Sequence, residues 1–250
     1  MELNFVFFAL AIPAVIFAGI SKGGFGSGAA FAATPLLALI LEPGPAIGVM
    51  LPLLMLMDVS ALRPYWRQWD VRASWALVIG GVPGVALGAL LYGIADPDVF
   101  RLLIGAIALG FVAFQLGRAR GWIRPAKRTL PDAAGAGIGM IAGFTSFISH
   151  AGGPPAAVYL LSRRLDKRTY QATTVIVFWA INVVKFVPYL FLGIFDRQTL
   201  IADLYLAPFA VLGIWLGVWF HRVVPERLFF TLVYAFRTVT GTKLIFDALT

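Results

Sequence analysis

The chain has 250 residues, of which 60% are apolar and only 13% are charged, and its mean hydropathy is +0.87. A soluble domain carries about 25% charged residues because its surface must face water, so this composition excludes a soluble protein and predicts an integral membrane protein. The net charge of +8 does not indicate nucleic-acid binding, because the basic residues lie in short loops between apolar runs, where they set membrane topology.

A transmembrane helix needs about 20 largely apolar residues, with about 17 as the usual lower limit. Six apolar runs reach this length, at 46–62, 75–93, 98–117, 172–192, 199–220 and 228–247. Four further runs form two interrupted pairs, at 3–20 with 28–41 and at 132–149 with 154–161. We therefore expect an all-α membrane protein in which two helices are broken.

Both interruptions are rich in glycine. The first region, 3–41, breaks at SKGGFGSG (21–28), and the second, 132–161, breaks at SHAGGPP (149–155). The arms that follow are only 14 and 8 residues long, which is short for a span. Irregular backbone at membrane depth is tolerated only where it is buried in protein or lines a cavity, so both breaks are candidate functional elements.

The distribution of Lys and Arg predicts the orientation. These residues concentrate in the loops 63–74, 118–130, 162–170 and 221–227, whereas 42–45 and 95–98 have none and 193–198 has only Arg197. By the positive-inside rule the first four loops are cytoplasmic. We expect a multi-pass protein of the inner membrane with both termini outside, in the periplasm. The first broken segment then enters from outside and the second from the cytoplasm.

The chain also contains an internal repeat. Shifting the sequence by 124 residues aligns 18–37 with 142–161, with seven identities in twenty positions. Each half has a broken, re-entrant helical hairpin followed by three transmembrane helices, and because three is odd the halves must be inverted. We predict a single transmembrane domain, 1–250, with repeat one over 1–121, a cytoplasmic linker over 118–131 and repeat two over 132–250. Paired interruptions in inverted repeats point to a transporter's binding site.

The motifs resemble those of the TauE/SafE sulfite exporter family over essentially the whole chain. They are SKGGFGSG followed by TPLLAL in the first half, and GFTSFISHAGGPPAAVYLL with NVVKFVPYLFLG in the second. The first motif departs in reading GFGSGAA, where members often have a longer glycine run. The resemblance implies a secondary transporter that exports a small sulfur-containing anion, such as sulfite or an organosulfonate (sulfoacetate or a taurine-derived product).

The breaks suit an anion, because helix N-termini offer unpaired N–H groups and a partial positive charge. Ser27 is a candidate cap for the arm that starts near Gly28, and Pro154–Pro155 suit the first turn of the other arm. We expect both N-termini to converge on one anion; the alternative is that the glycines only permit close helix packing. The predicted substrate-binding residues are Ser21, Lys22, Gly24, Gly26, Ser27, Gly28, Ser146, Ser149, His150, Gly152, Gly153, Asn182 and Lys185.

Ionisable residues inside apolar runs are rare and usually functional. Lys22 lies in the first break and His150 in the second, whereas Lys185 lies well inside the apolar run 172–192, three residues after Asn182. The excess of base at membrane depth favours an anion. Lys22 could instead extend to the membrane surface. Asp58 and Arg237 are interpreted as charges with a gating or a structural role. In the structural role, the two side chains would form a buried ion pair. His150 is the candidate for coupling transport to protons, or else a hydrogen-bonded core residue.

Other function classes are weaker. An anion channel or a carrier for a non-sulfur organic anion would share the basic site, although broken pseudo-symmetric hairpins favour alternating access. An enzyme is not expected, because Ser27 lacks the flanking glycines of a nucleophile elbow and adjacent Ser149 and His150 do not form a nucleophile–base pair. With no cysteine and two histidines, neither a metal nor a cofactor is expected. The expected partners are a small anion, protons, lipids and, as an open alternative, further copies of the chain.

Overall fold

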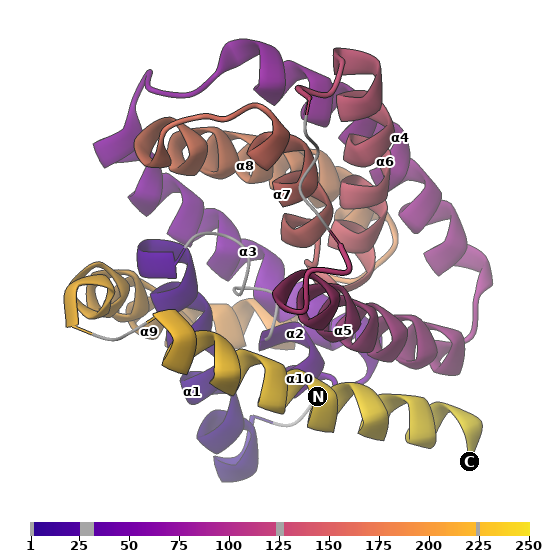
Figure 1. The fold of residues 1–250 in the computed structure, drawn as a ribbon. Helices are drawn as coiled ribbons and strands as arrows, with labels where there is room; N and C mark the ends of the chain where they lie inside the picture. The colour runs from indigo at the N-terminus through magenta and orange to yellow at the C-terminus, as the bar shows by residue number, and fades with distance from the viewer. Residues whose placement is uncertain (1–2, 26–32, 124–127, 224–225) are drawn as a thin grey trace.

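The computed structural model describes residues 3–25, 33–123, 128–223 and 226–250, and within these ranges it contains helices and no strand (Figure 1). In chain order the elements are α1 (Phe5–Ile20), the π-helix η1 (Ser21–Phe25), α2 (Ala33–Leu37), α3 (Pro43–Leu62), the 3-10 helix η3 (Arg63–Tyr65), α4 (Val71–Ile94), α5 (Pro97–Ala119), α6 (Asp132–Ser149), α7 (Gly153–Ser162), α8 (Lys167–Phe191), α9 (Arg197–Val223) and α10 (Glu226–Leu249).

Local sequence signals set where several of these helices begin. Asp70 caps α4 by accepting a hydrogen bond from the backbone N–H of Ala73 at 2.8 Å. Asp166 caps α8 in the same way, and α3 and α5 begin with prolines. Side-chain oxygens satisfy N–H groups that a helix leaves unpaired, and proline has no N–H to lose at this position.

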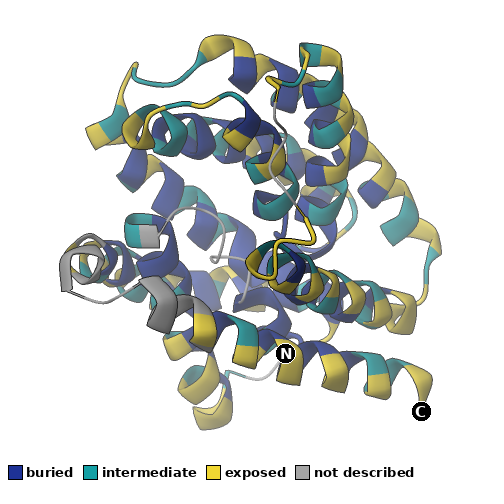
Figure 2. Cartoon of the chain, in the orientation of Figure 1, coloured by how far each residue is buried: buried dark blue, intermediate teal, exposed yellow. Residues whose placement is uncertain are grey.

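The fold is that of a multi-pass membrane protein. Among the described residues six helices are long and apolar enough to cross a membrane: Phe5–Gly24, Pro43–Tyr65, Val71–Ile94, Pro97–Ala119, Lys167–Phe191 and Arg197–Gly217. The last five correspond to predicted spans, and α10 corresponds to the predicted span 228–247. The outer faces of the helices are exposed (Figure 2). Many of the exposed side chains are large and apolar, such as Trp215, which is 74% exposed, and Ile79, which is 61% exposed. Lipid, rather than water, is the solvent that suits such a surface.

The second predicted break is present. Helix α6 ends at Ser149, His150 adopts a left-handed backbone conformation with φ of 54°, and α7 begins at Gly153. A left-handed residue directly after a helix turns the chain and pairs its N–H with the last carbonyls, here that of Ser146 at 2.9 Å. The 10-residue α7 is too short to span a membrane.

The first break differs from the prediction. Residues 21–25, which the sequence placed inside the break, continue α1 as a π-helical turn. The helix therefore extends far enough for Phe5–Gly24 to qualify as a span. The arm predicted at 28–41 is helical over Ala33–Leu37, and residues 26–32 lie outside the described part of the chain.

Helix boundaries and helix packing agree with a two-half repeat. Helices α3 and α8 begin at Pro43 and Lys167, which are 124 residues apart, the offset of the sequence alignment. At this offset α1 corresponds to α6, α3 to α8 and α4 to α9. Helix α4 packs on α6, and the corresponding pair, α9 on α1, is also in contact (Figure 1). In the same way α3 packs on α9, and the corresponding α8 packs on α4. The contacts of α5 with α10 and of α3 with α8 join helices that correspond in the two halves. These correspondences support the repeat, and the inversion of its halves stays a prediction.

Glycines allow the backbones of these helix pairs to touch. A Cβ atom at Gly84 of α4 would overlap the carbonyl oxygen of Met140, and one at Gly143 of α6 would overlap that of Gly81. In the corresponding pair, a Cβ at Gly19 of α1 would lie 2.8 Å from backbone atoms of Gly213 in α9. Close approach through small residues is a principal source of helix association in lipid. The packing explanation of the glycines therefore holds for these contacts.

Replacing Gly143 by Ala should destabilise the protein by about 1–3 kcal/mol, because the added methyl group forces α6 away from α4. Gly137 lies on the same helix and is the matched control, since a Cβ there meets no atom within 4 Å. The Gly137→Ala variant should be neutral or more stable by up to about 1 kcal/mol. Thermal unfolding in detergent measures both, and equal melting temperatures for the two variants would contradict this packing.

Candidate functional site

Polar side chains from both predicted halves meet where α3 crosses α8. Lys22 comes from η1, Asp58 from α3, Asn182 and Lys185 from α8, and His150 from the break between α6 and α7. Each of these residues is at most 8% exposed. Buried ionisable groups in a membrane protein mark a functional site in most cases, and this cluster is the candidate site.

Asp58 connects the two halves. Its Oδ1 lies 2.7 Å from the Lys22 Nζ in a buried ion pair, and its Oδ2 accepts a hydrogen bond from the Asn182 Nδ2 at 2.8 Å. Lys22 also donates to the carbonyl oxygen of Leu54 at 3.1 Å. The alternative in which Lys22 extends to the membrane surface is wrong, because the ion pair holds this ammonium group in the interior.

The predicted pair between Asp58 and Arg237 is also wrong. The carboxylate binds Lys22 and Asn182 instead, whereas the guanidinium group of Arg237 lies over the ring of Phe111, 4.7 Å from its centroid. A buried carboxylate is stabilised by the cation nearest to it, and only the folding of η1 onto α3 decides which cation that is.

Lys185 and His150 form the second part of the cluster. The Lys185 Nζ donates to the carbonyl oxygen of Ser146 at 3.1 Å and lies 2.7 Å from the His150 Nδ1. With Lys185 protonated, its ammonium group can only donate; the His150 Nδ1 then accepts, and the imidazole proton resides on Nε2, 3.0 Å from the Ile47 carbonyl oxygen. This tautomer follows from the hydrogen-bond partners and leaves His150 neutral. The lysine also lies at the C-terminal end of α6, where the helix dipole favours a cation.

A polar cavity of about 20 Å³ lies inside the cluster. It is lined by Lys22, Leu54, Ser146, His150, Gly153, Phe178 and Asn182. This volume admits about one water molecule, so an oxyanion needs the surrounding elements to move apart before it can bind. Gly153 is the first residue of α7, and the N-terminal end of that helix, with its partial positive charge, therefore borders the cavity.

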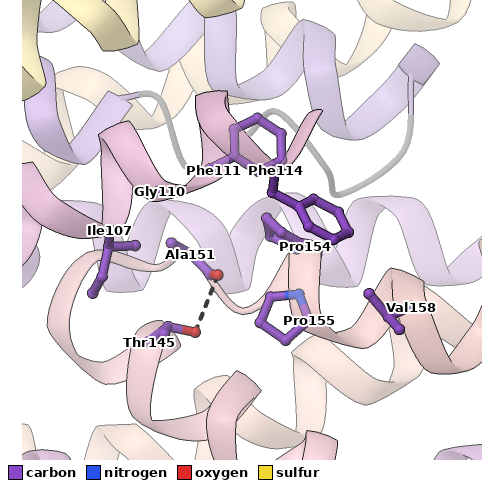
Figure 3. A pocket seen from close by; sticks show the side chains of 9 residues that line it. All are labelled: Ile107, Gly110, Phe111, Phe114, Thr145, Ala151, Pro154, Pro155 and Val158. Atoms are coloured by element: carbon purple, nitrogen blue, oxygen red, sulfur yellow. Dashed lines mark hydrogen bonds between the residues drawn. The ribbon is translucent and has the colours of Figure 1, made fainter. Parts of the chain in front are cut away.

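A second, apolar pocket of about 260 Å³ lies on the α5 side of the same break. Figure 3 shows its wall, in which Phe111 and Phe114 of α5 face Pro154 and Pro155 of α7, while the Thr145 hydroxyl donates to the Ala151 carbonyl at 3.1 Å. Apolar walls cannot replace the hydration of an anion. This pocket is therefore not the anion site, although it leaves space beside the short arm.

The remaining predicted residues divide into three groups. Ser21 and Ser149 are buried near the cluster, and the Ser149 hydroxyl donates to the Thr145 carbonyl at 3.4 Å. Gly24 packs against the backbone of Gly217, and a Cβ at Gly152 would lie 2.6 Å from the Ala142 carbonyl oxygen, so close packing explains these two glycines. Gly26, Ser27 and Gly28 lie outside the described residues.

Sequence reasoning missed the backbone and amide partners of the cluster. The carbonyl oxygens of Ile47 and Leu54 accept from His150 and Lys22, and the Gln171 side chain donates to the Lys22 carbonyl at 3.3 Å. Every residue has a carbonyl group, so no sequence signal distinguishes those of Ile47 and Leu54.

A model of the family described as "Sulfite exporter TauE/SafE" matches residues 11–244. The chain belongs to the TauE/SafE sulfite exporter family. No curated protein and no solved structure matches it. The match covers both interruptions and every residue of the cluster, and TauE/SafE membership makes the chain a membrane transporter, in agreement with its six candidate spans.

Replacing Lys22 by Met in this TauE/SafE protein should lower its stability by about 3–5 kcal/mol, because the Asp58 carboxylate then stays buried without a counter-charge. The double variant Lys22→Met/Asp58→Asn should recover much of that loss. The control is Lys243→Met, which breaks the exposed Lys243–Asp247 pair at 2.8 Å and should cost about 1 kcal/mol or less. Denaturation in detergent measures all three, and a double variant no more stable than Lys22→Met would contradict the pair.

Proposed function

We propose that this TauE/SafE protein is a secondary transporter that exports a small sulfur-containing anion, sulfite or an organosulfonate, by alternating access around its two breaks. The observation that supports it most directly is the charge of the buried cluster. Two ammonium groups, Lys22 and Lys185, lie beside one carboxylate, Asp58, and a neutral imidazole. With both lysines protonated, the cluster carries more positive than negative charge in a medium that strongly disfavours unbalanced charge, and this excess favours an anion over a cation.

The hydrogen-bonding groups around the cavity suit an oxyanion. Lys22 has three N–H donors, of which one contacts Asp58 and one the Leu54 carbonyl, so a third is available toward the cavity that Lys22 lines. Ser146, the amide of Asn182 and the N-terminal end of α7 border the same space. Charge-assisted N–H and O–H bonds of this kind replace the hydration of sulfite or sulfonate oxygens.

The position of the cluster supports alternating access. Asp58 and Asn182 are 124 residues apart, which is the repeat offset, so they occupy equivalent positions in the two halves. Equivalent residues that touch each other must lie on the axis that relates the halves. Transporters built from inverted repeats bind their substrates at that interface, and the small volume of the cavity requires the breaks to open and close around the anion.

Orientation and partners belong to the same proposal. The inner membrane, with both termini in the periplasm, follows from the basic loops and the positive-inside rule. Proton coupling, contacts with lipids and assembly with further copies are additional parts of the hypothesis. The proposed anion-binding site is formed by Lys22, Ser146, His150, Asn182 and Lys185, together with Gly153 at the start of α7.

Purified protein in liposomes should show saturable uptake of labelled sulfite that unlabelled sulfite on the opposite side accelerates. Sulfoacetate should compete, and lactate should not. Linear flux without this acceleration would indicate a channel, and competition by lactate but by neither sulfur compound would indicate a carrier for a different organic anion.

Replacing Lys185 by Met should weaken the apparent affinity for the anion on the order of tenfold to a hundredfold, because a hydrogen bond to a charged group contributes about 1.5–3 kcal/mol. The control is Lys243→Met, whose lysine lies in an exposed pair near the end of α10 and should leave affinity unchanged. The half-saturating concentration in the liposome assay measures the effect, and equal values for the two variants would exclude Lys185 from the site.

A further inference from the structure

The Asp58 carboxylate forms an ion pair with the Lys22 ammonium group, to which the transported anion is proposed to bind. It is 2.7 Å from the Lys22 Nζ, and neither side chain is more than 4% exposed. Asn182, which holds the other carboxylate oxygen, lines the cavity together with Lys22. An anion bound to Lys22 would therefore lie within a few ångströms of Asp58, where two negative charges repel strongly because little water screens them. Asp58 and the anion compete for one ammonium group.

A proton on Asp58 removes this conflict without changing the buried charge. With Asp58 ionised the cluster has two positive charges and one negative charge, a total of +1. When the carboxylate binds a proton and Lys22 binds a monovalent anion, the total is again +1. Binding the anion alone would bring the total to zero but place two anions side by side, and binding the proton alone would leave +2 in the interior, which is costly.

Asn182 can hydrogen-bond Asp58 in both protonation forms. Its Nδ2 donates to the carboxylate at 2.8 Å. When the proton is on Oδ1, Oδ2 keeps its lone pairs and still accepts from this Nδ2, so the hydrogen bond to Asn182 survives protonation. Since a buried polar group without a partner is costly, an amide at this position lets Asp58 gain and lose a proton without losing its partner on α8.

The charged groups around Asp58 favour it over His150 as the proton acceptor. Lys22 faces it from η1, and Asn182 and Lys185 lie on α8. No titratable side chain of α9 or α5 forms an ion pair with Asp58 in the described part of the chain. Among the described residues, the His150 ring nitrogens contact Lys185 and the Ile47 carbonyl oxygen, and a second proton on the imidazole would enter on Nδ1, which faces the Lys185 ammonium group 2.7 Å away. Like charges at that separation oppose protonation.

We propose that Asp58 binds the transported proton, so that one proton on its carboxylate and one monovalent oxyanion on Lys22 cross the membrane together. This step is electroneutral: the proton joins Asp58 Oδ1 as that oxygen leaves Lys22, and it dissociates when the anion is released. The proposal rests on the proposed function and adds to it the coupling ion, its stoichiometry and the residue that binds it. The concentration gradients of the anion and of the proton together would then drive export, independently of the membrane potential.

The test is Asp58→Asn, which preserves the size of the side chain and mimics the protonated form. The assay uses liposomes with a pH-sensitive dye and a membrane potential set by potassium and valinomycin. Liposomes with the unaltered protein should take up one proton per anion. Their anion flux should rise at acidic pH and should not depend on the potential. The Asp58→Asn variant should move the anion without a proton, should respond to the potential, and should bind sulfite about tenfold more tightly at neutral pH, because the competing charge is absent.

Three further variants control the test. Asp247→Asn removes a carboxylate from the exposed pair with Lys243 and should behave like the unaltered protein, and His150→Gln should retain the proton. Asn182→Asp places a second carboxylate beside the first and should weaken anion binding about tenfold at neutral pH, with recovery on acidification. It tests the charge argument even where Asp58→Asn folds poorly.

The outcomes separate this inference from the proposed function. Proton uptake that persists in Asp58→Asn, or that disappears in His150→Gln alone, would overturn the role of Asp58. Unchanged sulfite affinity in Asn182→Asp would overturn it as well. If the unaltered protein moves lactate and no sulfur anion, but loses proton coupling in Asp58→Asn, the sulfur substrate is wrong and the role of Asp58 stands. Absence of flux for sulfite, sulfoacetate and lactate would overturn both.

Discussion

Hydrocarbon cannot solvate charge, and this constraint explains the arrangement of the buried cluster. In lipid every buried ion must find a partner within the protein, and here η1, α3, α6 and α8 all contribute groups to the network of Lys22, Asp58 and Lys185. These partners come from distant parts of the chain, so the network forms only when both halves are packed together. The same contacts that satisfy the charges join η1, through α3 and α8, to the break at His150.

Helix packing provides the scaffold that makes this possible. Glycines bring α4 against α6 and α1 against α9 at backbone contact, and those pairs include the helices that lead into the two breaks. Because α6 is fixed against α4, the Ser146 carbonyl group near its C-terminal end accepts from Lys185, while the chain turns at His150 and α7 begins at Gly153. The stable helix pairs thus position a short arm that is itself too small to span the bilayer.

The asymmetry between the halves is as informative as their similarity. Asp58 and Asn182 are separated by the 124-residue offset of the sequence alignment and are hydrogen-bonded to each other, yet one is an acid and the other an amide. Two carboxylates at these positions would balance the charges of both lysines, whereas two amides would leave a net charge of +2 in the interior. With both lysines protonated, one acid leaves an excess of positive charge beside a cavity that an N-terminal helix end also borders, and this arrangement supports the proposed anion site.

Composition and hydrophobic run length determined the class of this protein, because lipid demands long apolar helices whatever the details of packing. The same reasoning located α3 to α10 to within a few residues and found the break at His150, since glycine and proline act locally. It also selected Asp58 and Lys185, because charge inside an apolar run is visible in the sequence, together with Asn182 three residues before Lys185 and Lys22 in the first break. Which charges pair was decided only by the tertiary structure, which gave Asp58 to Lys22 rather than to Arg237. The π-helical continuation into Ser21–Phe25 likewise depends on packing, because α9 supports that turn, and such contacts between distant segments have no signature in the local sequence.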